Sequence, residues 1–382
     1  MKGAYNRLMH PSALFSDILK LVSHSLSLFC MGQVTLRSLS ALVGTLVPWW
    51  LVWGLGLGSN LQAASSVART PSHDSELRYW LENMITHHHF SVSEAASATG
   101  LSHPQIEKAM QEWSIQPSPT RSSPSHLLVL PYPGGRHPRI GFLDGAIDPQ
   151  RETKVSAFAP WKGGGYAVLD IPEAIWSNLG LTYLAHTHIP TVWDEQSIAL
   201  ETTEWTRHPD HSLSMERLLP NGISFGTHVA GAHGGLIMDM WLRNGSEAAL
   251  DDLRVQNCVM FRELAGFEVQ SNDNKLLLPP YIACHDVEGR RWAITAWTPH
   301  QRCWANAPCP CMHSDPQFPD CAPGETQRLK GWFSFYQGVD IVGEIQRLQD
   351  LGWDRSARQP LRVAKEAFFV IGWGHAIHPL AP

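Results

Sequence analysis

The strongest constraint on the fold is a two-residue alternation of apolar and polar side chains across residues 211–261. In the clearest segment, Leu236, Met238, Met240 and Leu242 occupy every second position. Such a pattern is typical of β-strands that bury one face. Short turns separate the segments, at Asn221-Gly222, His233-Gly234-Gly235 and Asn244-Gly245. Because Asn-Gly supplies the positive φ angles that tight hairpins require, we predict an antiparallel meander here.

The same pattern extends to the body of the chain. From Leu127 to Gly338 strand-like segments predominate, and residues 291–297 alternate again. Strand-like and helix-like segments do not alternate along the chain as they do in βαβ proteins, so a parallel sheet is not expected. The predicted fold class is mainly β, an antiparallel β-sandwich preceded by a small helical domain.

Composition divides the chain into blocks. Helical patterning comes before a stretch rich in Pro and Ser, which is typical of a linker. After the β region, Ile341, Ile345 and Leu348 show helical spacing. The predicted blocks are a signal segment at residues 1–64, a helical domain at 72–114, a linker at 115–126, the β-sandwich at 127–338, and a C-terminal helix and tail at 339–382.

An uncharged stretch near the N-terminus predicts export. Residues 41–58 carry no charge and are followed by small and polar residues, as in a secretory signal peptide. Translation from Met31 would give it a short leader carrying Arg37, and cleavage would leave a mature chain beginning near Ser65. The chain is therefore expected in the periplasm or outside the cell. An uncleaved membrane anchor is the alternative, since eighteen residues approach the minimum for a spanning helix.

Charge and tryptophan content bear on the partners. The formal net charge of −6 gives no electrostatic reason to expect nucleic acid or an anionic membrane as partner. The chain has 16 Trp, nine of them from Trp161 to Trp332. A Trp-rich β domain is suited to stacking on sugars, and core packing is the alternative role of each ring.

Six cysteines follow the signal segment. An even number in an exported protein predicts up to three disulfides, with the pairing left open. Alternatively, Cys309, Cys311 and His313, together with Cys303 or Cys321, could bind zinc. The candidates for disulfides are Cys258, Cys284, Cys303, Cys309, Cys311 and Cys321.

Residues 92–114 resemble the helix-turn-helix of bacterial DNA-binding proteins, with Gly100 as the turn glycine and Ile106 as the buried residue of the second helix. Between Asp74 and Ser114 there are six acidic and two basic residues, a net charge of 2 − 6 = −4. A domain with this charge repels duplex DNA, so a structural or protein-contact role is expected.

Residues 215–261 are similar to part of the galactose mutarotase-like supersandwich family. The turn at Arg243-Asn244 and the strand leading to Phe261 carry the resemblance, as do the closing residues 321–338. The family implies a supersandwich fold and carbohydrate as ligand. Its ring-opening His would fall near Asn257, and an amide cannot act as a general acid. The resemblance therefore implies carbohydrate binding or a diverged carbohydrate-processing activity.

The best candidate site begins with His186 and His188. Two His at this spacing on a strand point to one face, and Asp194 or Glu195 could complete an acid–base or metal site. We predict His186, His188 and Asp194 as catalytic, with Trp193 as a stacking platform. The metal alternative uses His186, His188 and Glu195, in a pattern that loosely resembles the cupin motif.

Arg136 is the predicted anion-binding residue, because it lies in a basic loop that enters the β region. The leading functional hypothesis is an exported protein that binds or processes carbohydrate or another small polar ligand, with no cofactor or a divalent metal. Three alternatives remain. They are a non-enzymatic envelope or interaction protein, a metal-dependent cupin-like enzyme, and a membrane-tethered DNA-binding regulator.

Overall fold

The computed structural model describes residues 68–119, 122–123, 125–141, 147–186 and 188–355. The predicted signal segment, residues 1–64, lies outside this part of the chain. Within the described residues, no helix has the length and apolar character needed to cross a membrane.

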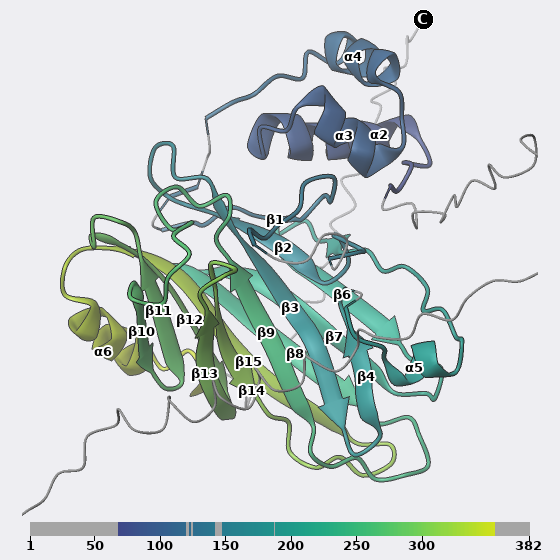
Figure 1. Cartoon of the computed structure of the whole chain (residues 1–382), viewed down its shortest axis with the longest axis vertical. Coiled ribbons are helices and arrows are strands. Elements are labelled where there is room, and N and C mark those ends of the chain that lie inside the picture. Colours follow the sequence, from purple (N-terminus) through teal and green to yellow (C-terminus); the bar gives the residue numbers. More distant parts are fainter. Residues whose placement is uncertain (1–67, 120–121, 124, 142–146, 187, 356–382) are drawn as a thin grey trace, which may run out of the picture. The chain divides into compact units, whose positions relative to one another are not determined.

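Two antiparallel sheets make up the β region (Figure 1). The first has seven strands in the order β1–β2–β3–β9–β14–β13, and β4 pairs with the second half of β3. Its strands are β1 (Val129–Pro131), β2 (Lys154–Phe158), β3 (Tyr166–Ser177), β4 (Gly180–Leu184), β9 (Arg254–Met260), β13 (His300–Asn306) and β14 (Cys311–Pro316).

The second sheet has eight strands in the order β10–β11–β12–β15–β8–β7–β6–β5. Its strands are β5 (Thr206–Arg207), β6 (Leu213–Leu218), β7 (Ser224–Ala232), β8 (Gly235–Arg243), β10 (Lys275–Leu278), β11 (Tyr281–His285), β12 (Arg291–Thr298) and β15 (Thr326–Gln337). Among these, β7 and β8 form the hairpin that the alternating pattern predicts, with Val229 opposite Met238.

The two sheets pack face to face around the main core. Leu169, Val259 and Met312 from the first sheet share one buried apolar cluster with Phe225 and Met238 from the second. Side chains that alternate with these on each strand must lie on the opposite, outer face of their sheet. The predicted antiparallel β-sandwich is confirmed.

A helix covers part of the outer face of the second sheet. α6 (Ile341–Leu351) buries Ile341, Ile345 and Leu348 in a separate cluster with Ile294 and Trp332 of the sheet. The three-to-four-residue spacing of these apolar side chains gives the helix a single buried stripe.

The helical segment consists of α2 (Asp74–Leu81), a π-helical turn at Glu82–His87, α3 (Val92–Thr99) and α4 (His103–Glu112). Ser91 begins α3 and Ser102 begins α4, each with a capping box. Gly100 ends α3 with φ of +73°, a left-handed conformation that suits glycine. Nothing in these helices tests the resemblance to DNA-binding proteins, which stays a prediction.

Buried polar contacts fasten this helical segment to the first sheet. The Nδ2 of Asn83 donates to the carbonyl of Pro131 at 3.0 Å. The Nε2 of His88 lies 2.7 Å from the hydroxyl of Ser156 on β2. Both His88 and Ser156 are buried. The helical segment therefore packs against the first sheet at β1 and β2.

The predicted disulfides are not formed. All six described cysteines are free thiols, and five of them are buried. Cys258 and Cys311 lie on the neighbouring strands β9 and β14, whereas Cys284 belongs to β11 in the other sheet. The even count indicated cross-links because it assumed an oxidising compartment, but even Cys258 and Cys311, which lie close together, are unlinked.

Candidate functional site

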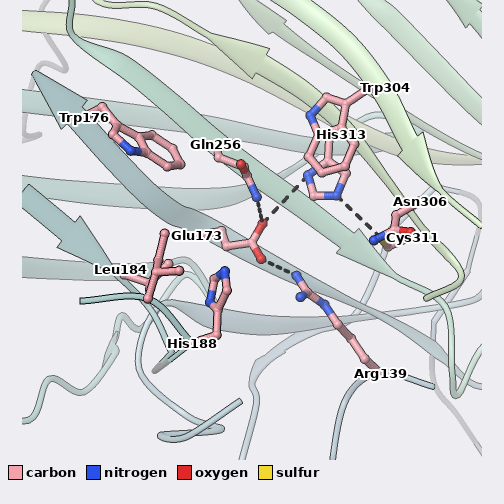
Figure 2. A pocket seen from close by; sticks show the side chains of 11 residues that line it. Arg139, Glu173, Trp176, Leu184, His188, Gln256, Trp304, Asn306, Cys311 and His313 are labelled. Carbon is pink, nitrogen blue, oxygen red and sulfur yellow. Dashed lines mark hydrogen bonds and ion pairs between the residues drawn. The ribbon is translucent and has the colours of Figure 1, made fainter. Parts of the chain in front are cut away.

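A cavity of about 320 Å³ lies on the outer face of the first sheet (Figure 2). On β9, Val255 and Val259 belong to the core, so Gln256 and Cys258 point to the outer face. The cavity is lined by Arg139, Glu173, Trp176, Leu184, His188, Ile189, Gln256, Trp304, Asn306, Cys311 and His313.

A bulge in β3 places the acidic residue of this cavity. Asp170 pairs with Cys258 of β9, and Ala174 pairs with Gln256. Between these two pairs β3 advances four residues and β9 only two. The extra residues include Pro172, which cannot donate a ladder hydrogen bond. Bulges of this kind re-aim side chains next to functional sites, and here Glu173 points into the cavity.

Three donors surround the carboxylate of Glu173, which is only 2% exposed. Arg139 forms a hydrogen-bonded ion pair with Oε1, and the Nε2 of His186 lies 2.8 Å from the same oxygen. The Nε2 of Gln256 donates to Oε2 at 2.7 Å. Burial alone would raise the pKa of Glu173, but Arg139 and His186 hold it well below its usual range. The carboxylate is therefore ionised.

His186 connects Glu173 to His188. The Nδ1 atoms of the two histidines are 3.1 Å apart, and their rings stack with centroids 4.8 Å apart. Because a carboxylate only accepts, the Nε2 of His186 carries a proton. Of the two tautomers that this contact allows, we assign the one in which the Nδ1–H of His188 donates to the Nδ1 of His186, which leaves the Nε2 of His188 unprotonated. Burial, and next the neighbouring His186, lower the pKa of His188, so this ring is neutral near pH 7.

One wall of the cavity is formed by Trp304 and His313, and Asp315 supports the indole of Trp304. The rings of Trp304 and His313 are nearly parallel, with an interplanar angle of 7° and centroids 3.8 Å apart. Asp315 accepts a hydrogen bond from the Nε1 of Trp304 at 2.7 Å, and this fixes the indole. Figure 2 shows Trp176 and Trp304 on opposite sides of Glu173 and Gln256. The cavity thus has two aromatic walls and a charged floor.

The structure brings two of the predicted catalytic residues together. His186 and His188 are in contact and lie beside the cavity, but the strand β4 ends at Leu184, before either residue. The prediction that they share a strand face is wrong. Their proximity comes from the loop after β4 and from the bond of His186 to Glu173.

The other predicted site residues have structural positions. Trp193 is buried in the main core and donates its Nε1 to the carbonyl of Thr182, so it offers no open stacking face. Asp194 caps the short helix α5 (Val192–Glu195) by accepting from Thr191. Glu195 is exposed on the same helix and does not belong to the acidic group around His186, which consists of Asp170 and Glu173.

Arg136 is also corrected. Its guanidinium binds Glu94 of α3 at 2.5 Å and Glu263 at 3.0 Å, and it donates to the hydroxyl of Tyr166. It joins the helical segment to the β-sandwich, and Arg139 is the arginine that lines the cavity. The sequence marked the right loop, because both arginines lie in it.

Several lining residues carry no signal in the sequence. Glu173 lies within a strand that is buried on both faces, so no alternation distinguishes it. Gln256 and Trp304 are ordinary strand residues until the strands are paired. For Cys311 and His313 there was a signal, the predicted zinc motif. The structure pairs them with Cys258, not with Cys303 or Cys321.

Comparison with known proteins gives a distant structural likeness. No protein-family model matches the chain, and no curated protein matches it significantly. Among solved structures, 30 chains match. One is described as "Putative kojibiose phosphorylase from human microbiome", with a TM-score of 0.33 and 5% sequence identity. The match covers 63% of this chain and 36% of that protein, so this chain spans little more than a third of its length. A likeness at this level carries no argument about function.

Proposed function

We propose that the cavity binds a carbohydrate or another small polyhydroxylated ligand. The observation that carries this proposal is the ionised Glu173 on the floor between the two Trp side chains. A carboxylate is a strong acceptor for hydroxyl groups, and an indole face packs on the C–H groups of a sugar ring. A volume of about 320 Å³ suits a small ligand.

The polar lining matches a ligand with several hydroxyl groups. Gln256 and Asn306 carry amides, which both donate and accept hydrogen bonds. Arg139 adds donors, although its guanidinium is already shared with Glu173. A flat apolar ligand would make no hydrogen bond to the two amides, at a cost of about 1–3 kcal/mol for each amide atom that it shuts off from water. The lining therefore selects for a polar ligand.

We assign proton transfer to His188 within this proposal. Its unprotonated Nε2 can accept a proton from a ligand hydroxyl or an acidic C–H group, which converts the ring into an imidazolium. His186 accepts the hydrogen bond from the Nδ1–H, and Glu173 stabilises the positive charge through His186. This order of groups resembles the carboxylate–histidine pairs that orient general bases in enzymes. Binding without reaction is the alternative, and it needs only the walls and the floor.

Calorimetric titration with a panel of mono- and disaccharides tests the binding step. Trp176→Ala removes one wall and is expected to weaken binding by up to about tenfold, from the value of an aromatic contact. Trp241→Ala is the matched control, since this half-buried Trp lies on β8 in the other sheet. Failure of every sugar to bind the wild-type protein would contradict the proposal. Equal weakening by the two variants would exclude Trp176 as a wall.

A further inference from the structure

We infer that Cys258, Cys311 and His313 form a zinc site with one coordination position open to the cavity. The three residues come from the neighbouring strands β9 and β14, where Cys311 pairs with Met260 and Met312 pairs with Val259. Continuing this register by one step sets His313 opposite Cys258. Since side chains alternate along a strand, all three residues lie on the outer face of the sheet.

The separations between the donor atoms suit a tetrahedral ion. The two sulfur atoms and an imidazole nitrogen all lie within 4.8 Å of one another. The Sγ of Cys311 is 3.5 Å from the Nε2 of His313. With zinc–sulfur and zinc–nitrogen bonds of about 2.3 and 2.0 Å at the tetrahedral angle, the expected separation is about 3.5 Å. A zinc ion thus fits with little movement of these two side chains.

The surroundings of His313 fix the nitrogen that a metal requires. Its Nδ1 donates to the carbonyl oxygen of Asn257 at 2.9 Å. In the neutral ring this leaves the Nε2 lone pair directed toward Cys311. A hydrogen bond from the other ring nitrogen to a carbonyl is the usual partner of a metal-bound His. The stacked Trp304, held by Asp315, keeps the ring plane in place.

Cys258 has a matching outer partner. The guanidinium of Arg139 donates to its Sγ at 3.2 Å. Hydrogen bonds to a metal-bound thiolate stabilise its negative charge. Two thiolates neutralise one Zn²⁺, and the ion pair of Arg139 with Glu173 is neutral as well, so the buried group carries no excess charge. Buried ions are tolerated only with this kind of compensation.

Three protein ligands leave the fourth position for water or substrate, the arrangement of catalytic zinc sites. Cys311 and His313 both line the cavity, so the open position faces the space assigned above to the ligand. Thiolate and imidazole together favour zinc over magnesium or calcium, which prefer oxygen. The inference does not depend on which ligand the cavity binds.

The other metal-like group does not compete. Asp170, Glu173 and His186 also bring their donor atoms together. However, the Nζ of Lys154 is 3.1 Å from Asp170, and Arg139 is paired with Glu173. Both carboxylates thus already have a cationic partner.

Metal analysis and cobalt substitution of the purified full chain test the site. We expect about one zinc ion per folded chain, and thiolate-to-cobalt charge-transfer absorption after exchange with Co²⁺. Cys258→Ser and Cys311→Ser should each weaken metal binding by more than tenfold in competition with a chelator. Cys284→Ser is the matched control, because this buried thiol lies on β11 in the other sheet.

A second measurement needs no variant. Bound zinc should protect Cys258 and Cys311 of the wild-type protein from alkylation, mapped by mass spectrometry, and leave the labelling of Cys303 unchanged. Folded wild-type protein that binds no zinc or cobalt would overturn the inference. So would metal binding that is unchanged in both serine variants, or a disulfide between Cys258 and Cys311 in the native protein. None of these outcomes depends on sugar binding.

Discussion

Arg136 and Arg139 lie three positions apart in one loop, and their guanidinium groups act at different parts of the outer face of the first sheet. Arg136 binds Glu94 and Glu263, whose side chains are 28% and 25% exposed. Arg139 binds Glu173, which is 2% exposed. One ion pair joins two segments near the surface, and the other holds a charge beneath a cavity.

The two arginines differ in what they hold in place. Arg136 attaches one segment to another, whereas Arg139 holds a buried carboxylate beside a cavity. Around Arg136 the partners come from the helical segment and from the turn that follows β9, so the arginine links these two segments. Arg139 is one of three donors around the carboxylate of Glu173, and a cavity of about 320 Å³ lies beside this carboxylate. Buried polar groups next to a cavity are typical of functional sites, whereas the same groups between two packed segments are usually structural.

The largest expected effect is on stability when the two arginines are exchanged for Met. Arg139→Met leaves the buried Glu173 without its cationic partner and should reduce the free energy of unfolding by about 3–5 kcal/mol. Arg136→Met, the matched control, should cost about 1–2 kcal/mol because its carboxylates can reach water. Urea unfolding measures both changes. Equal losses would mean that the two ion pairs do not differ in the way their burial suggests.

This pair of residues also shows how far the sequence leads. The β-sandwich could be predicted because β7 and β8 alternate between a buried and an outer face, with Gly-containing turns between strands. The loop with both arginines could be recognised as basic. The pairing of β3 with β9 decides which of the two arginines lies beside the cavity. Local sequence patterns do not show this pairing.

Two features explain why most of the candidate site escaped prediction. Glu173 lies in a bulge of a strand without alternation, so its register cannot be inferred from the sequence. Cys258 and His313 are 313 − 258 = 55 residues apart and meet only when β9 pairs with β14. By contrast, His186 and His188 were recognised, because residues two apart stay close in almost any conformation.

An effect that grows with acidity is expected at His88, which lies between the helical segment and the first sheet. Burial, and more weakly the neighbouring His87, Arg136 and His89, lower the pKa of His88 to about 3. In the unfolded chain the pKa is about 6.5, so below this pH the unfolded state gains a proton that the folded state does not bind. Stability should therefore fall as the pH drops from about 6.5 toward 3, by up to about 1.4 kcal/mol per pH unit.

The variant His88→Gln removes this titration. Its free energy of unfolding, measured by urea at several pH values, should depend less steeply on pH than that of the wild-type protein between about 6.5 and 4. Glu94 and the other carboxylates are common to both proteins, so the difference between the slopes reports His88 alone. Parallel curves would show that His88 is not kept neutral between the helices and the sheet.

The smallest effect on stability should come from His188, and it completes the comparison within the cavity. His188→Ala removes a partly exposed ring, and water from the cavity can replace its hydrogen bond to the Nδ1 of His186, so the free energy of unfolding should change by less than about 1 kcal/mol. His186→Ala, two positions away, removes a buried donor to Glu173 and should cost about 1–3 kcal/mol.

If His188 transfers a proton, its loss should lower the rate with a reactive ligand by about 10²–10⁴-fold and leave folding intact. Nuclear magnetic resonance titration of the His188 ring provides an independent readout, because a ring positioned by His186 should titrate below the usual pKa in the wild-type protein and shift upward in His186→Ala. If His188→Ala destabilises the protein as much as His186→Ala, both rings are structural, and the open cavity is then only a binding site.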